Sequence, residues 1–459
     1  MFSGNKIHFV SLGCPRNLVD SEVMLGILLK AGYEATEQVA EADYLVVNTC
    51  GFLAASRQES SDTIGDLLKE KKPGAKLVAT GCMVQKHSGE LKEKFPDIHY
   101  FLGSGDVEKI LEAIQAPTPG ASITSAKSYL QWGEVPRQLS TPKNYAYLKI
   151  AEGCLKACSF CIIPKIKGPL RSKPEDQVVK EFQMLLSQGV HEVILIAQDL
   201  GDYAKEKKVK GGLEALLKKM LETPKDFWLR FLYLYPDEIS DELIELMQKD
   251  PRICAYLDMP IQHINNEVLK RMRRKTSREE IIATLLKLRE KIPHVVIRTS
   301  LMVGFPGETE AQFEELLDFI QEYPLDNVGI FKYSREEESH SAGLPDHVSE
   351  EVKEKRFQRL VKAQMKMIRK RNKRYVAQRL SVMVEGFHPE SEYLMRGRFY
   401  GQCPEIDGQV IINDGRLVTG FGQLYEVEIT DVADYDLIGR VVAPAKKTVK
   451  KSQVLSLVS

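Results

Sequence analysis

No stretch of this sequence approaches the ~20 consecutive apolar residues that a membrane-spanning helix requires. The start of the chain also lacks the basic residues and following apolar stretch of a signal peptide, so we expect a cytoplasmic protein. Disulfide bonds are disfavoured in that compartment, where cysteines more often bind metal or take part in catalysis. Net charge is absent too, because 64 Lys and Arg balance 64 Asp and Glu, and it therefore indicates no class of partner.

What the sequence does contain is a run of three closely spaced cysteines, Cys154, Cys158 and Cys161. Thiolates at this C-x3-C-x2-C spacing suit an iron–sulfur cluster, which normally takes four cysteine ligands. Only three are supplied here, so one iron would be left for a ligand that is not protein. A structural zinc site is the weaker interpretation, since neither a second C-x2-C pair nor an H-x3-5-H pair follows.

Length and composition predict a globular protein of several domains. The 459 residues allow two to four domains at about 150 residues each, and 43% hydrophobic residues suffice for a sizeable core. Changes in the pattern of predicted strands, helices and turns divide the chain into five parts. These are a first domain at 5–116, a linker at 117–140, a central domain at 141–372, a third domain at 373–445 and a basic tail at 446–459.

The first domain alternates short β runs with amphipathic helices, which is typical of a parallel α/β sheet. Three of its β runs lead directly into Cys14, Cys50 and Cys82. Because the carboxyl ends of parallel strands meet at one edge of a sheet, we expect the three thiols to lie together there. The pattern favours a second three-cysteine cluster; three unrelated buried thiols are the alternative.

The central domain holds six βα units, which predict a partial (β/α)6 barrel with its active site at the carboxyl ends of the strands. The triplet Cys154–Cys161 follows the first of these strands, where a cofactor is expected. Gly304–Glu308 could cradle part of a ligand, although a turn into the next helix is the more ordinary interpretation; a lone histidine is likewise more often structural. Six polar residues on the strands or at their ends are candidate contacts to a small polar cofactor: Gln198, Asp199, Gln262, His263, Arg298 and Ser300.

Charge is distributed unevenly over the last third of the chain. The third domain switches to short alternating strands, which predict a small β-barrel; residues 376–445 carry five basic and eleven acidic side chains, a net of 5 − 11 = −6. Such a barrel should repel RNA and attract a basic protein surface. Residues 352–374 form a predicted helix with eleven Lys and Arg and one Glu, a net of +10. A solvated face and a phosphate-facing patch explain this helix equally well.

The triplet, with Phe160 before its last cysteine, resembles the radical S-adenosylmethionine (SAM) signature. Together with the three N-terminal cysteines and the C-terminal β module, it is similar to the methylthiotransferase family. Gly13–Glu22 resembles the RimO type, which acts on ribosomal protein uS12, whereas the tRNA-modifying relatives usually carry Gly-Cys-Gln at its start. Leu232–Pro236 and Tyr256–His263 are similar to the same type. Arg16 departs from the motif, where lysine is commoner, but keeps the positive charge.

The resemblance implies a flavodoxin-like N-terminal methylthiotransferase domain, a radical SAM core of the TIM type and a TRAM domain. It implies two 4Fe-4S clusters, one on Cys14, Cys50 and Cys82 and one, with SAM bound, on Cys154, Cys158 and Cys161. SAM, cleaved by one electron from a donor of unknown identity, would yield a radical that abstracts hydrogen from the β-carbon of an aspartate in uS12. A methylthio group would then be added to that carbon. No catalytic residue beyond the cluster ligands is predicted, and Cys254 and Cys403 match no ligand position.

Two other functions remain as alternatives. A tRNA methylthiotransferase would use the basic helix for contact with nucleic acid, whereas we predict a protein substrate and no membrane partner. A non-catalytic iron–sulfur protein for electron transfer or cluster delivery is more distant, because it has little need for a six-unit barrel with a SAM-type loop.

Overall fold

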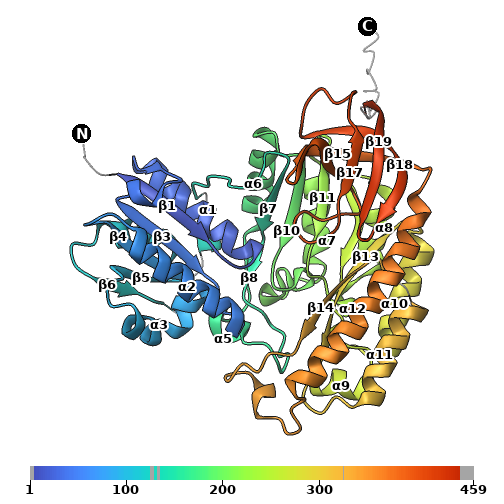
Figure 1. Cartoon of the computed structure of the whole chain (residues 1–459), viewed down its shortest axis with the longest axis horizontal. Coiled ribbons are helices and arrows are strands. Elements are labelled where there is room, and N and C mark those ends of the chain that lie inside the picture. Colours follow the sequence, from blue (N-terminus) through green and yellow to red (C-terminus); the bar gives the residue numbers. More distant parts are fainter. Residues whose placement is uncertain (1–4, 125–128, 132–134, 324, 445–459) are drawn as a thin grey trace.

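The computed structural model of the chain describes residues 5–124, 129–131, 135–323 and 325–444. Two six-stranded sheets and a closed five-stranded barrel follow one another along these residues (Figure 1). No helix in these ranges combines the length and the apolarity of a membrane span. The predicted basic tail at 446–459 lies outside the described residues, and the predicted domain boundaries stay a prediction.

The first sheet is parallel throughout, in the order β2-β1-β3-β4-β5-β6, and confirms the predicted α/β domain. Successive side chains on a strand point to opposite faces. Val46 and Val78 therefore enter a core with α1 and α4, whereas Val47 and Leu77 enter a separate core with α2 and α3. The elements are β1 (Lys6–Ser11), α1 (Pro15–Lys30), β2 (Glu34–Ala35), β3 (Tyr44–Thr49), α2 (Ala54–Glu70), β4 (Lys76–Gly81), α3 (Cys82–Lys94), β5 (Tyr100–Gly103), α4 (Ile110–Gln115) and β6 (Gly120–Ser122).

The second sheet is also parallel, in the order β14-β13-β12-β11-β10-β7, and its two outer strands do not pair with each other. It is thus the predicted partial barrel, with helices on its outer face. The strands are β7 (Tyr145–Lys149), β10 (Glu192–Ile196), β11 (Trp228–Phe231), β12 (Ile253–Asp258), β13 (Val296–Val303) and β14 (Asn327–Lys332). The main helices are α6 (Glu175–Ser187), α7 (Gly212–Leu221), α8 (Asp241–Lys249), α10 (Arg278–Lys291), α11 (Glu310–Glu322) and α12 (Glu350–Asn372).

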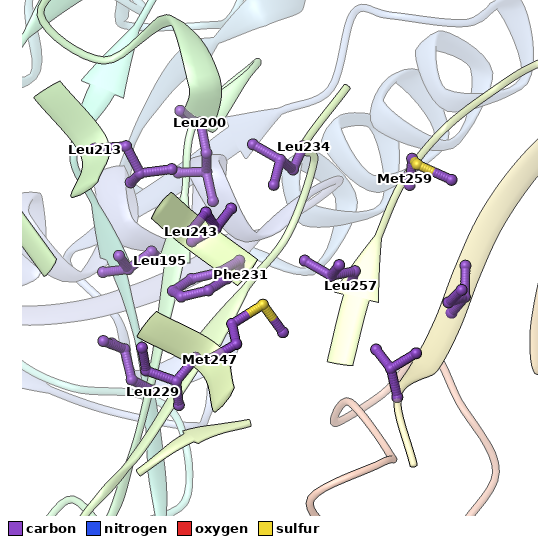
Figure 2. Close-up of a cluster of buried hydrophobic side chains, with 14 of the residues drawn as sticks. Leu195, Leu200, Leu213, Leu229, Phe231, Leu234, Leu243, Met247, Leu257 and Met259 are labelled. Carbon is purple, nitrogen blue, oxygen red and sulfur yellow. The ribbon is translucent and has the colours of Figure 1, made fainter. Parts of the chain in front are cut away.

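Local sequence fixes where several of these helices begin. Ser277 and Glu280 form a reciprocal capping box at the start of α10, and Thr309 and Gln312 form another at the start of α11. The outer face of the sheet then buries the largest apolar core of the described chain. Figure 2 shows part of it, where side chains of β10, β11 and β12 meet those of α8.

The third structure is the predicted small β-barrel, closed in the order β15-β16-β17-β19-β18. Its strands are β15 (Arg379–His388), β16 (Ser391–Phe399), β17 (Val410–Asp414), β18 (Gln423–Ala433) and β19 (Asp436–Pro444). It packs against the amino-terminal ends of the central strands, since Cys403 shares an apolar cluster with Tyr145 and Val296 at the starts of β7 and β13. Figure 1 shows this barrel (red) at one end of the central sheet and the short helix α5 (Ile163–Lys167), which follows the cysteine triplet, near the other.

Buried ion pairs tie the three parts of the chain together inside the central sheet. Glu192 at the start of β10 binds Arg230 at 2.5 Å and Arg398 of the C-terminal barrel at 2.8 Å. On the side of the first domain, Asp20 of α1 pairs with Lys149 at the end of β7. The pairs Glu192–Arg398 and Asp20–Lys149 are almost completely buried. Each of these charges is therefore compensated by a partner in another part of the chain.

Candidate functional site

The three N-terminal cysteines lie at one edge of the first sheet, as predicted. Cys14 caps the start of α1 behind β1, Cys50 follows β3 directly, and Cys82 is the first residue of α3 behind β4. These three strands are adjacent. Gly13 has φ +91, and a Cβ there would lie 2.9 Å from the Cβ of Cys50, so only glycine lets the two loops approach this closely.

Asn17 connects the three cysteine-bearing segments. Its Nδ2 donates hydrogen bonds to the carbonyls of Leu12 at 3.1 Å and Thr49 at 3.0 Å, and its Oδ1 lies 3.5 Å from the Sγ of Cys82. Its own carbonyl accepts from the side chain of Asn48 at 2.8 Å. The motif Gly13–Glu22 is thus a structural unit that holds the Cys14 helix against the strands bearing the other two thiols.

The thiols of this set differ in how readily they ionise. Burial works against ionisation of Cys14, but the Arg16 guanidinium and nearby backbone N–H groups outweigh it, so the pKa of Cys14 lies below its ordinary value. Burial raises the pKa of Cys50, and raises that of Cys82 to about 12. A metal bound at these thiols would favour their ionised form.

The second set of thiols lies in the loop before α5. The loop is fixed against α9 (Asn266–Arg271) and its end, because the Ser159 hydroxyl donates to the Arg271 carbonyl at 2.8 Å and the Ser159 N–H donates to the Met272 carbonyl at 3.0 Å. Burial raises the pKa of Cys154 to about 11 and that of Cys161 to about 12. All eight cysteines of the chain are free thiols, which both sets need if they are to hold clusters.

Lys156, inside the triplet, anchors this loop to the strand ends. Asp199, Asp202 and Glu238 bring oxygens within 4.8 Å of one another, as metal ligands do. The ammonium group of Lys156 lies 3.3, 3.5 and 2.6 Å from them, so these carboxylates form an ion-pair cage around a lysine. Burial raises the pKa of Asp199 to about 7, against the effect of Lys156.

Two side chains beside Cys158 were not predicted from the sequence. The Arg274 Nη1 lies 3.7 Å from the Sγ of Cys158, and the Tyr235 hydroxyl lies 3.6 Å from the same sulfur. The guanidinium also stacks on the Tyr235 ring at 4.0 Å. Tyr235 belongs to the segment Leu232–Pro236 that resembled the RimO type, whereas no sequence signal identified Arg274.

The candidate cofactor contacts fall into two groups. The side chains of Asp199, His263 and Arg298 have partners inside the protein: Lys156 for Asp199, the Asn265 N–H for the Nδ1 of His263, and Asp258 for Arg298. The three others, Gln198, Gln262 and Ser300, are partly exposed at or near the carboxyl ends of β10, β12 and β13. The Oε1 of Gln198 is buried without a hydrogen-bond partner among the described residues.

In the turn Gly304–Glu308, one oxygen of the Glu308 carboxylate binds backbone N–H groups of the turn itself. The Oε2 of Glu308 accepts from the N–H of Gly304 and, at 3.0 Å, from that of Phe305. This arrangement corresponds to the ordinary turn into α11. The backbone of Gln262 has φ +71, and its N–H and carbonyl bond to β13 at 2.8 and 2.7 Å. A left-handed conformation at a residue other than glycine stores strain, and such strain is common at ligand sites.

The first domain is docked so that the two thiol sets face each other. Cys82 packs in one apolar cluster with Ile162, which directly precedes α5, and with Ile166 of α5 itself. Arg57 of α2 also joins the two domains, because it pairs at 2.6 Å with Glu336 in the loop after β14. Each set offers three thiols, whereas a 4Fe-4S cluster normally takes four cysteine ligands. The residues present therefore fit two clusters that would each keep one iron for a ligand that is not protein.

Comparison with known proteins follows the same three parts. Family models match at residues 6–103 (Uncharacterized protein family UPF0004), 148–320 (Radical SAM superfamily) and 376–442 (TRAM domain). Among solved structures, the radical SAM methyltransferase TsrM from Kitasatospora setae has a TM-score of 0.53 over 73% of each chain. At 16% identity this likeness shows the fold alone. Fold and site together define a radical SAM enzyme with an additional N-terminal cysteine domain.

Its relatives are more specific. The ribosomal protein uS12 methylthiotransferase RimO of Protochlamydia amoebophila (strain UWE25) is 65% identical over 96% of this chain and 93% of its own length. That of Chlamydia abortus (strain DSM 27085 / S26/3) is 59% identical over 96% of both, and that of Geotalea uraniireducens (strain Rf4) is 45% identical over 95% and 98%. The chain belongs to the RimO family of methylthiotransferases. It is a radical SAM transferase that uses SAM and 4Fe-4S clusters.

Proposed function

We propose that this chain adds a methylthio group to the β-carbon of an aspartate in ribosomal protein uS12. The observation that carries the proposal is that the two three-cysteine sets lie together where the first domain packs on the central domain. The chain is also 65% identical to a uS12 methylthiotransferase. When bound, the clusters and SAM supply the electron, the hydrogen-abstracting group and the methylated sulfur. The chain itself positions the two thiol sets through the packing of the first domain on the central domain.

For the ligands, we propose Cys14, Cys50 and Cys82 for one cluster and Cys154, Cys158 and Cys161 for the other. SAM bound at the second cluster would lie beside Gln198, Gln262 and Ser300, the candidate contacts whose side chains have no charged partner inside the protein. Asp199, His263 and Arg298 would act indirectly, through Lys156, the loop at Asn265 and Asp258.

The charges of the last third support a protein substrate over tRNA. Six cations of the basic helix α12 are paired within the chain: Lys353, Lys355, Arg356, Arg359, Arg369 and Arg371. Much of its positive charge therefore has a structural role and is not free for phosphates. On the acidic barrel, Glu390, Glu392 and Asp431 are exposed without an ion pair among the described residues, and they suit a basic ribosomal protein.

Two further features of the proposal concern the surroundings of the enzyme. We propose that it works in the cytoplasm, where ribosomal proteins are made, in keeping with eight free thiols. We also propose a one-electron donor as a transient partner, since SAM cleavage consumes one electron per event.

The test incubates reduced enzyme and SAM with uS12 or with tRNA and reads the mass of each product. We expect a methylthio group on one aspartate of uS12 and none on tRNA. A Cys154→Ala variant serves as the control, because it should leave uS12 unmodified. A methylthio group that appeared only on tRNA would overturn the proposal.

A further inference from the structure

Arg16 projects from the first turn of α1 into the space between the two thiol sets. Its Nη1 donates to the carbonyl of Ala197, at the end of β10, at 2.7 Å, and its guanidinium lies over the ring of Tyr233 at 4.8 Å. Arg16 lies two residues after Cys14, at the start of α1, and Ala197 follows β10 directly. A residue of the first domain thus reaches the wall of the central barrel at the point where the two domains meet.

The surrounding cations show what is unusual about Arg16. Lys156, Lys167 and Arg298 each have a carboxylate within 4 Å, at 2.6, 2.8 and 2.8 Å. Among the described residues, Arg16 has no carboxylate within that distance, and its recorded protein acceptor is the Ala197 carbonyl. Arg274 also lacks a carboxylate, but it directs its N–H groups to Cys158 and to the Pro260 carbonyl in the barrel wall.

Arg16 is partly buried, and a guanidinium without a carboxylate partner is available to pair with a carboxylate of a ligand. A guanidinium carries five N–H donors in a planar fork that matches a carboxylate. One donor of Arg16 is held by Ala197 and one edge faces Cys14, so donors remain for a ligand. Tyr233, held with φ +65, presents its ring to the guanidinium and fixes its plane.

We propose that Arg16 binds the carboxylate of the substrate aspartate and thereby holds its β-carbon between the two clusters. This inference rests on the proposed function. The β-carbon of aspartate is bonded directly to the carboxylate carbon, so anchoring the carboxylate fixes the reacting carbon. A neutral amide or a nucleobase at the same place would leave the guanidinium unpaired, which makes Arg16 a determinant of specificity.

The experiment compares the wild type with Arg16→Met and Arg16→Lys on a uS12 peptide that carries the modified aspartate, and on the same peptide with asparagine. We expect the wild type to prefer the aspartate peptide, and Arg16→Met to raise its KM roughly tenfold to hundredfold. The preference for aspartate over asparagine should disappear in Arg16→Met and persist in weaker form in Arg16→Lys. Arg369→Met, an exposed arginine on α12, is the matched control and should change neither value.

Iron content and the spectra of the clusters are measured on every variant, because Arg16 also lies beside Cys14. Full iron with an unchanged KM and unchanged preference in Arg16→Met would overturn the inference while leaving the proposed function intact. If Arg16→Met loses iron, its KM values do not test the inference, and the wild type alone is compared on the two peptides. Equal KM values of the wild type for the two peptides would then overturn the inference. A wild type that leaves the aspartate peptide unmodified would overturn the proposed function, and the inference with it.

Discussion

Individual side chains around the thiols position them and place hydrogen-bond donors beside them, which the cysteine spacing alone does not indicate. Asn17 bonds to the segments of β1, β3 and β4 that lead into the three N-terminal cysteines, so one amide determines their separation. Cys158 lies beside the guanidinium of Arg274 and the hydroxyl of Tyr235. Hydrogen bonds and charge near a cluster sulfur set the reduction potential of the cluster.

At this scale we predict that Arg274→Met lowers the midpoint potential of the cluster on Cys154, Cys158 and Cys161 by on the order of tens of millivolts. The Arg274 guanidinium, 3.7 Å from the Sγ of Cys158, would stabilise the extra negative charge of a reduced cluster held there, and methionine would not. The measurement is a redox titration followed by EPR, in a background where Cys14, Cys50 and Cys82 are alanine. The exposed neighbour Arg273→Met is the control. An unchanged potential at full iron content would show that Arg274 has a packing role only.

Ion pairs join the cysteine loop to the loops that follow β10 and β11. Lys156 of the cysteine loop connects to Asp199 and Asp202 behind β10 and to Glu238 behind β11. The cage is largely enclosed, with only 13% of the Lys156 side chain exposed. Lys205 also pairs with Asp202 at 3.0 Å and with Glu238 at 2.5 Å, so removal of Lys156 leaves one ammonium group for three carboxylates, which then repel one another.

We therefore predict that Lys156→Met destabilises the fold by about 3–5 kcal/mol and turns the three carboxylates into a site for a divalent cation. Thermal unfolding with and without Mn²⁺ measures both effects. Mn²⁺ should raise the Tm of the variant and leave the wild type unchanged. Lys207→Met, an exposed lysine with no recorded ion pair, is the control. A variant as stable as the wild type, with no response to Mn²⁺, would contradict the cage.

At the scale of the whole molecule, the three parts of the chain are joined by buried charges. Asp20 of α1 meets Lys149 of the central sheet, and next to them Lys167 pairs with Glu152 at 2.8 Å. At the other end, Arg398 of the C-terminal barrel reaches Glu192 at the start of β10. The C-terminal barrel therefore covers the end of the central sheet opposite the cysteine triplet.

For this joint we predict that Lys149→Met lowers the free energy of unfolding by about 3–5 kcal/mol. Lys167, which lies 3.5 Å from Asp20 and 2.8 Å from Glu152, is then the one remaining cation for two buried carboxylates. The double variant Asp20→Leu with Lys149→Met should recover much of the loss, since the pair Lys167–Glu152 remains matched. Urea unfolding of the single and double variants gives the coupling free energy. Strictly additive losses would mean that the two residues do not act as a pair.

The fold followed from the sequence because its signals are local and repeated. The alternation of β runs and amphipathic helices predicted both parallel sheets, and short alternating strands predicted the closed barrel. The candidate site was predicted less completely. The cysteine register is visible in the chain, whereas Arg274 and Lys156 gain their roles from loops that meet only after folding. The +10 helix shows the same limit, since the pairing of Arg359 with Glu310 depends on the packing of α12 on α11.

The sequence by itself determined that two sets of three thiols exist and at which strand ends each would lie, because a strand delivers the residue that follows it to a predictable edge. Only the tertiary structure decided that the two edges face each other and that Arg16 lies between them. That arrangement depends on docking α1 into the open side of the central sheet, through contacts such as Asp20 with Lys149. Side chains far apart in the chain create these contacts, and no periodicity along the sequence encodes them.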